Sequence, residues 1–229
     1  MTPDAAAWDA LRLSLWVAVW ATVLAIPLAL WVAWLLARRD FWGKSLLNAA
    51  VHLPLVLPPV VTGYLLLMAF GRTAPLGRAL DAIGLQLAFH WSGAVLAAMI
   101  MGFPLMVRAM RLAIEAVDPK LEEAAASLGA SRASVFGRVT LPLILPGILA
   151  GTVMGFAKAM GEFGATITFV ANIPGQTQTL PSAIWSALQI PGGEGQAVVM
   201  VLMACAVAVS AVLLSEMLAR RVAARIAGA

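Results

Sequence analysis

The side chains best suited to catalysis are few and lie far apart along the 229 residues. His52 and His90 are the only histidines, and neither belongs to the H-E-x-x-H pattern that holds zinc on one helical turn. Cys205 is the only cysteine and lies in an apolar run, where a lone cysteine packs as a small hydrophobe. These residue types and spacings predict no metal site, no cofactor and no disulfide framework. Both histidines are interpreted as interfacial side chains.

Lys158 and Glu162 are spaced i,i+4 in an apolar segment, so a helix would bring their opposite charges together. Counted from Pro142 at 1.5 Å per residue, the pair lies about 24 Å along that segment, which predicts a position near the outer face of a membrane. One interpretation is a mutually neutralising pair at the membrane surface. The other is a site in which Lys158 helps to receive an anion while Glu162 keeps it from binding too tightly.

A polar stretch in the middle of the chain, 118–142, has the features of a folded segment although long apolar runs flank it. Asp118 can cap a helix, and Pro119 suits the first helical position, where a missing N–H costs nothing. The residues that follow are good helix formers, and Gly129 is a natural C-terminal stop. The stretch therefore predicts a short helix that ends before Gly129, outside the membrane core.

Ser131 can cap a second short helix that runs to about Arg138. Small and apolar side chains share one face of the first helix: Leu121, Ala124, Ala125 and Leu128. Because this face has little bulk, we expect the elbow formed by 118–142 to fit a groove on another protein.

Glu123-Ala124-Ala125, three residues, Gly129, nine residues and then Val-Thr-Leu-Pro at 139–142 resembles the EAA motif of ABC-importer permeases. That motif has Ile where this chain has Val139. In that family the segment is the cytoplasmic coupling helix, which docks on the ATPase subunit. The resemblance implies coupling contacts from Leu121, Glu122, Glu123, Ala124, Ala125, Leu128 and Gly129. The alternative is a solvated, alanine-rich loop between membrane helices.

The composition is that of an integral membrane protein. Hydrophobic residues make up 62% of the chain and charged residues 11%, and the mean hydropathy is +0.94. A soluble domain carries about a quarter charged residues. The net charge of +4 is therefore interpreted through membrane topology and not through nucleic-acid binding. The acidic start has no charged n-region or clean cleavage site, so we expect no removable signal peptide.

Long apolar runs predict an all-α fold, a polytopic bundle of about five transmembrane helices in a single domain, 1–229. The expected spans are 11–37, 46–70, 91–114, 143–160 with a continuation to 166, and 197–218. Pro54, Pro58 and Pro59 interrupt the second span, so that helix is expected to be bent or partly unwound against protein or a wet cavity.

Three smaller features complete the expected layout. Pro104 predicts a kink in the third span. Residues 71–90 predict a short polar loop, and 181–189 predict a short helix that lies outside the membrane core.

The basic residues divide unevenly between the two sides of this layout. One side holds Arg38, Arg39, Lys44, Arg108, Arg111, Lys120, Arg132, Arg138, Arg220, Arg221 and Arg225, and the other holds Arg12, Arg72, Arg78 and Lys158. Eleven against four of the fifteen predicts that the elbow and the C-terminus lie in the cytoplasm and the N-terminus outside.

Two further stretches, HLPLVLPPVVTGYLLL at 52–67 and GEFGATITFVANIPGQTQTLPSAIW at 161–185, resemble molybdate-transport permease subunits. Sulfate and thiosulfate permeases share a related Gly-Glu-Phe-Gly stretch, and tungstate is chemically too close to molybdate to be separated. The resemblance implies a multi-pass inner-membrane protein that moves the anion by alternating access. It also implies a homodimer, two cytoplasmic subunits that bind ATP and magnesium, and an extracytoplasmic molybdate-binding protein.

The chain lacks the G-x-x-x-x-G-K-[ST] loop that holds ATP phosphates, so the energy source is expected to be another polypeptide. The broken second span and the segment after 158 offer polar groups for an anion pathway, because half-helix ends can direct partial charges at a pore. The candidate pathway residues are Pro58, Pro59, Thr62, Gly63, Tyr64, Lys158, Glu162 and Thr166. The alternative is that the prolines only shape packing.

Two other classes of protein fit the sequence less well than a transport subunit does. An intramembrane enzyme would need a histidine-based site, which the two separated histidines do not provide. A passive membrane scaffold would need neither a motif-bearing elbow nor a helix with three prolines.

Overall fold

The computed structural model describes residues 4–226, and every regular element among them is a helix, which confirms the all-α prediction. The elements are α1 Ala5–Arg38, α2 Lys44–Val56, α3 Pro59–Phe70, α4 Pro75–Asp81, α5 Trp91–Glu115, α6 Pro119–Ser127, α7 Arg132–Val135, the π-helix η1 Phe136–Thr140, α8 Leu141–Met160, α9 Gly164–Val170, α10 Leu180–Leu188 and α11 Glu194–Ile226.

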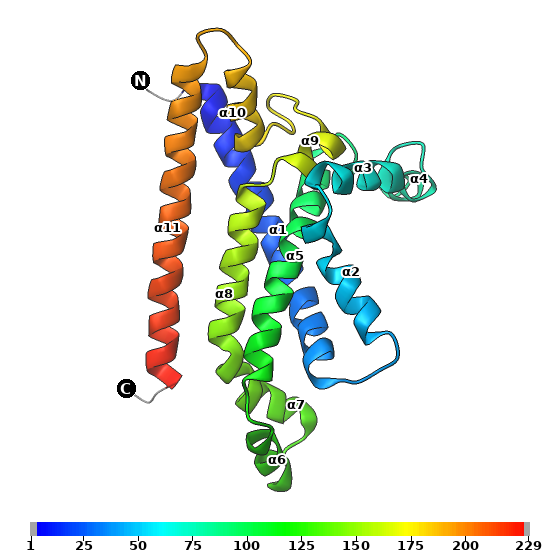
Figure 1. Ribbon diagram of the computed structural model, residues 1–229, viewed down its shortest axis with the longest axis vertical. Coiled ribbons are helices and arrows are strands. Elements are labelled where there is room, and N and C mark those ends of the chain that lie inside the picture. Colours follow the sequence, from blue (N-terminus) through cyan, green and yellow to red (C-terminus); the bar gives the residue numbers. More distant parts are fainter. Residues whose placement is uncertain (1–3, 227–229) are drawn as a thin grey trace.

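Within the described chain, four helices are long and apolar enough to cross a membrane, and the bent pair α2–α3 can add a fifth crossing. Figure 1 shows α1, α5, α8 and α11 side by side along the long axis of the molecule, with α6 and α7 beyond the bundle at one end. The N-terminus lies at the opposite end from α6, and α11 runs back toward the elbow end. This arrangement agrees with about five spans and places the N-terminus and the elbow at opposite ends of the bundle; the outer N-terminus and the cytoplasmic elbow stay predictions.

The second span is broken, as the prolines predicted. A proline disfavours helical geometry in the residue before it, and both Leu57 and Pro58 precede a proline. Leu57 has φ −71° and ψ 142°, and Pro58 has φ −54° and ψ 133°, so the helix stops and restarts at Pro59. The two halves meet at 114°, and α3 runs across the direction of the long helices. Pro54 remains inside α2.

The second elbow helix does not end near Arg138, contrary to expectation. It passes through η1 into α8, so that Arg132–Met160 is one continuous span. Pro142 cannot donate a backbone hydrogen bond, and in the widened turn before it Leu141 N–H donates to Phe136 O instead. The π-helix thus carries the chain from the elbow into the membrane without a break.

The fourth span ends at Met160, as expected, and its continuation to 166 is not part of the same helix. Gly161 closes α8, and the chain turns before α9 begins at Gly164. The expected loop 71–90 also contains structure, since α4 forms within it. The short helix expected at 181–189 is present as α10. Pro104 lies inside α5, which continues through it without interruption.

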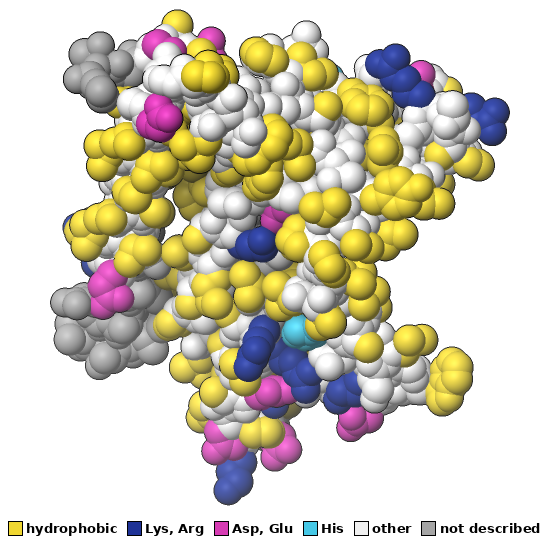
Figure 2. Space-filling view, turned by 45° about the horizontal axis from the view of Figure 1, so that its top comes forward, with side chains coloured by type: hydrophobic (Ala, Val, Ile, Leu, Met, Phe, Trp, Pro, Cys, Tyr) yellow, Lys and Arg dark blue, Asp and Glu magenta, His cyan; other side chains and the backbone are white. Residues whose placement is uncertain are grey.

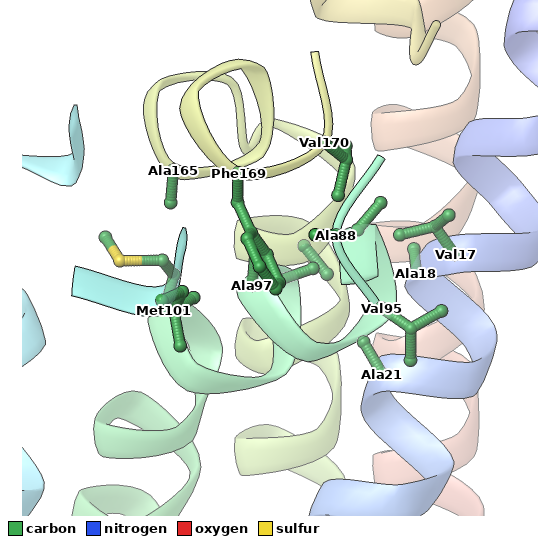
Figure 3. Packing of buried hydrophobic residues seen from close by; sticks show 14 residues of the cluster. Val17, Ala18, Ala21, Ala88, Val95, Ala97, Met101, Ala165, Phe169 and Val170 are labelled. Carbon is green, nitrogen blue, oxygen red and sulfur yellow. The ribbon is translucent and has the colours of Figure 1, made fainter. Parts of the chain in front are cut away.

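Small side chains let the long helices approach closely, as is common between membrane helices. Alanines lie buried along one stripe of α1 at positions 18, 21, 25, 29 and 33. Figure 3 shows Phe169 of α9 pointing toward Ala97 of α5, with Val170 near Ala88. Phe169 and Val170 are both fully buried, so α9 is anchored in the bundle and not laid on its surface.

Candidate functional site

The elbow has the local geometry that its sequence predicted. The Asp118 carboxylate accepts a hydrogen bond from Lys120 N–H (3.0 Å), which caps α6, and Pro119 takes the first helical position. Gly129 has φ +85°, and Ala130 N–H donates to Ala125 O at 3.2 Å, which closes the helix with a left-handed residue. The Ser131 hydroxyl accepts from Ser134 N–H at 3.3 Å and caps α7.

The apolar face of α6 points away from the bundle. Leu128 is 90% exposed and Leu121 is 49% exposed, and Ala124 and Glu123 are exposed beside them. Ala125, which the sequence placed on the same face, is half-buried. Exposed apolar side chains that group on one face are typical of a contact surface for another protein. Figure 2 shows basic side chains gathered around this end of the molecule, while hydrophobic side chains cover much of the rest.

Glu122 and Glu123 are adjacent but point in different directions. Glu122 turns toward the membrane helices, where its carboxylate accepts a hydrogen bond from the Thr140 hydroxyl at 2.6 Å. Glu123 stays exposed. Sequence reasoning grouped the two as coupling residues and missed both Thr140 and Arg38, the other partner of Glu122. No spacing signal could have found Arg38, which lies 84 residues away.

Lys158 and Glu162 form an ion pair with 2.7 Å between Nζ and Oε2. The Glu162 side chain is 1% exposed and that of Lys158 is 28% exposed, so the two charges neutralise each other in a largely buried position. Figure 1 shows α8 ending well short of the outer ends of α1 and α11, so the pair lies within the depth of the bundle. The neighbouring helices α1 and α11 extend further toward that end than α8 does, and the position of the pair near the outer face of the membrane stays a prediction.

Glu162 also organises the break between α8 and α9. Its second oxygen, Oε1, accepts a hydrogen bond from Ala165 N–H at 2.9 Å, one of the donors that a helix start leaves unpaired. The buried Thr166 hydroxyl donates within the same turn to Phe163 O at 2.9 Å. One carboxylate therefore neutralises Lys158 and caps α9.

The start of α3 lies directly against the start of α9. A Cβ atom on Gly63 would clash with the carbonyl oxygen of Ala165 and come within 2.9 Å of its Cα. A Cβ on Gly164 would come within 2.8 Å of the Pro59 side chain. Both glycines are therefore required by close backbone approach. Two stretches far apart in the sequence meet here, next to Glu162.

The predicted pathway residues divide into two groups. Thr62, Gly63, Glu162 and Thr166 are buried along the α3–α9 contact, with Lys158 at its edge. The Thr62 hydroxyl is buried and has no hydrogen-bond partner among the residues that the structure describes. Pro58, Pro59 and Tyr64 are exposed; Pro59 lies against Gly164 at the α3–α9 contact, whereas Tyr64 does not join the buried cluster. The cluster thus combines an ammonium group, a carboxylate and hydroxyl groups, which are suited to brief, weak contact with an ion that moves past them.

Residues 25–224 match the family described as binding-protein-dependent transport system inner membrane component. The molybdenum transport system permease protein ModB of Escherichia coli K12 is 56% identical over 214 residues, which is 93% of each chain. The sulfate transport system permease protein CysW of Synechococcus elongatus is 38% identical over 173 residues, 76% of this chain and 60% of that protein.

Among solved structures, a bacterial alginate ABC transporter in complex with a periplasmic protein bound to an alginate pentasaccharide is similar in fold. The TM-score is 0.74 at 18% identity, covering 93% of this chain and 78% of that chain. At this identity the similarity concerns the fold alone.

Lys158→Met is expected to destabilise the protein by about 3 kcal/mol, because it leaves the buried Glu162 carboxylate without its counter-charge. The double variant Lys158→Met/Glu162→Gln removes both charges, and the new amide oxygen can still accept from Ala165 N–H. It should recover most of the lost stability. Thermal unfolding in detergent measures both. A double variant no more stable than Lys158→Met alone would show that the loss does not come from an unpaired Glu162 carboxylate.

Proposed function

Because the chain belongs to the family of binding-protein-dependent transport system inner membrane components, we propose that it is the membrane subunit of an ATP-driven importer of molybdate or tungstate. It is a multi-pass inner-membrane protein and a transport component, not an enzyme. The anion assignment depends on one observation: the likeness to the molybdenum permease covers nearly the whole of both chains and exceeds that to the sulfate permease.

The working complex contains a second copy of this chain, two ATP-binding subunits in the cytoplasm and an anion-binding protein outside. ATP and magnesium bind to the ATP-binding subunits. A hydrophilic dianion needs a path enclosed by protein, because no part of it is soluble in the lipid core. Lys158 lies at the edge of one copy with about a quarter of its side chain exposed, which supports a path completed by a second copy.

The anion pathway runs past the α3–α9 contact and Lys158. An importer must bind its anion weakly enough to release it, and Lys158 already has a strong partner in Glu162 at 2.7 Å. The anion therefore meets a cation whose charge is partly neutralised. Thr62, whose hydroxyl has no protein partner, supplies a hydrogen-bond donor on the facing helix. Alternating access then requires α3 and α9 to separate and close.

The elbow transmits ATP hydrolysis to this pathway. Its exposed leucines, Leu121 and Leu128, and the small Ala124 between them fit a groove on the ATP-binding subunit. Glu123 is exposed on the other side of α6, where it lines the groove beside α1, and suits a basic residue of the partner. Gly129 ends α6 and sets the direction in which this face points.

ATP hydrolysis by the complete complex in proteoliposomes is the first test of the anion assignment. We expect molybdate-loaded binding protein to stimulate hydrolysis severalfold and sulfate-loaded binding protein to leave it at the basal rate. Stimulation by sulfate would make the chain a sulfate permease subunit with the same coupling. An assembled complex that responds to neither anion would refute the proposed substrate class.

The double variant Lys158→Met/Glu162→Gln tests the pathway, because it removes the cation without leaving a buried charge unpaired. We expect molybdate uptake to fall about tenfold or more, as for the loss of one charge-assisted contact. Arg221→Gln is the control, since it removes an exposed cation from α11 at the cytoplasmic end. Unchanged uptake in the double variant at normal expression would remove Lys158 from the pathway.

Gly129→Val tests docking by the elbow. Nothing lies within 4 Å of the added Cβ, so the cost comes from forcing a β-branched residue to φ +85°. That strain is about 1–2 kcal/mol and should weaken binding of the ATP-binding subunit by about 5- to 30-fold. Gly129→Asn is the matched control, because asparagine tolerates the left-handed region. Full association and uptake by the Gly129→Val variant would contradict the docking assignment.

A further inference from the structure

One carboxylate on the inner side of the elbow joins three membrane helices. Glu122 Oε1 accepts a hydrogen bond from the Thr140 hydroxyl at 2.6 Å and lies 3.4 Å from Arg38 Nη2. The same Arg38 nitrogen donates to Val117 O at 3.2 Å. Arg38 ends α1, Val117 follows α5, and Thr140 precedes α8. Glu122 thus attaches α6 to the ends of these helices that lie nearest the elbow.

This cluster is partly shielded from water. The side chains of Arg38 and Glu122 are 18% and 26% exposed, and Thr140 is 2% exposed. Leu36, Ile114, Val117 and Ile144 form part of the apolar cluster beside it. The neighbouring Lys44–Asp40 pair differs, since its carboxylate is 98% exposed. A shielded pair restrains its two elements more strongly than an exposed one, and losing either member leaves a poorly hydrated charge.

Few other contacts hold α6 to the bundle. It packs on its elbow neighbours α7 and η1, and among the described helices it has no extensive contact with α1. An open groove of about 820 Å³ separates the elbow from the lower part of α1, with Trp31 and Trp34 on the α1 side. The orientation of α6 relative to α1 therefore depends on the cluster around Glu122.

We propose that Glu122 is a positioning residue that couples the elbow to the membrane helices. Through its contacts with Arg38 and Thr140, Glu122 transmits movement of the elbow to the adjoining ends of α1 and α8. This inference rests on the proposed docking of the elbow on the ATP-binding subunit. The two adjacent carboxylates then have separate tasks: Glu123 contacts the partner, and Glu122 contacts the bundle.

The proposal predicts uncoupling without dissociation. Glu122→Gln should bind the ATP-binding subunit as the unchanged protein does and hydrolyse ATP, while molybdate uptake per ATP hydrolysed falls about tenfold, as for loss of a hydrogen-bonded charge. Arg38→Gln should behave alike, and Arg38→Gln/Glu122→Gln should be no worse than either single variant, because the two residues act as one unit. Glu123→Gln is the matched control and should lower subunit affinity at an unchanged uptake per ATP.

The measurements are subunit affinity, ATP hydrolysis and molybdate uptake in the same proteoliposomes. Unchanged uptake per ATP in Glu122→Gln, or a loss of affinity like that of Glu123→Gln, would overturn the proposal. If Glu122→Gln fails to assemble, Thr140→Val decides, since it removes only the hydroxyl; lowered coupling supports the proposal and unchanged coupling overturns it. Failure of the proposed function itself would appear in the unchanged complex, as absent uptake or absent subunit binding.

Discussion

An unpaired backbone group costs several kcal/mol inside a bilayer, and this chain interrupts its helices twice within the bundle. The first break, at Leu57 and Pro58, follows from proline chemistry, and the second, between α8 and α9, follows Gly161. Each break is tolerated because the segments beyond them, α3 and α9, cover one another. Gly63 and Gly164 permit that contact by leaving room for the facing backbone. The backbone groups at the two breaks must be covered by protein, and the contact between α3 and α9 that covers them also brings the polar side chains together.

Two carboxylates make similar sets of contacts, one near each end of α8. Glu162 binds Lys158 and caps α9, and Glu122 binds Arg38 and Thr140. Each takes a cation and a hydrogen-bond donor from different segments, so each restrains a junction that a transport cycle would have to move. A junction held by a few polar contacts can change state at lower cost than one held by a packed apolar core. The long α8 helix, continuous with the elbow through η1, connects the two junctions.

Local features of the candidate site were predictable from sequence. Asp118, Pro119 and Gly129 cap, start and end α6 as their chemistry requires, because capping depends only on residues within a turn or two. The prolines of the second span predicted its break for the same reason. The predicted fourth span agrees with α8, but its continuity with the elbow and the separate start of α9 were missed, since the π-helical turn before Pro142 and the capping of α9 by Glu162 involve bonds that a propensity rule does not contain.

The sequence by itself determined that this is a helical membrane protein and how its elbow folds, and it predicted which side the elbow faces. Hydropathy, charge asymmetry and capping are sums over neighbouring residues, so they need no knowledge of packing. Only the tertiary structure decided that Glu162 is buried, that Gly63 meets Ala165, and that Glu122 rather than Glu123 turns inward to Arg38. The last of these contacts joins residues 84 positions apart. Such contacts depend on how whole helices pack, which no local pattern encodes.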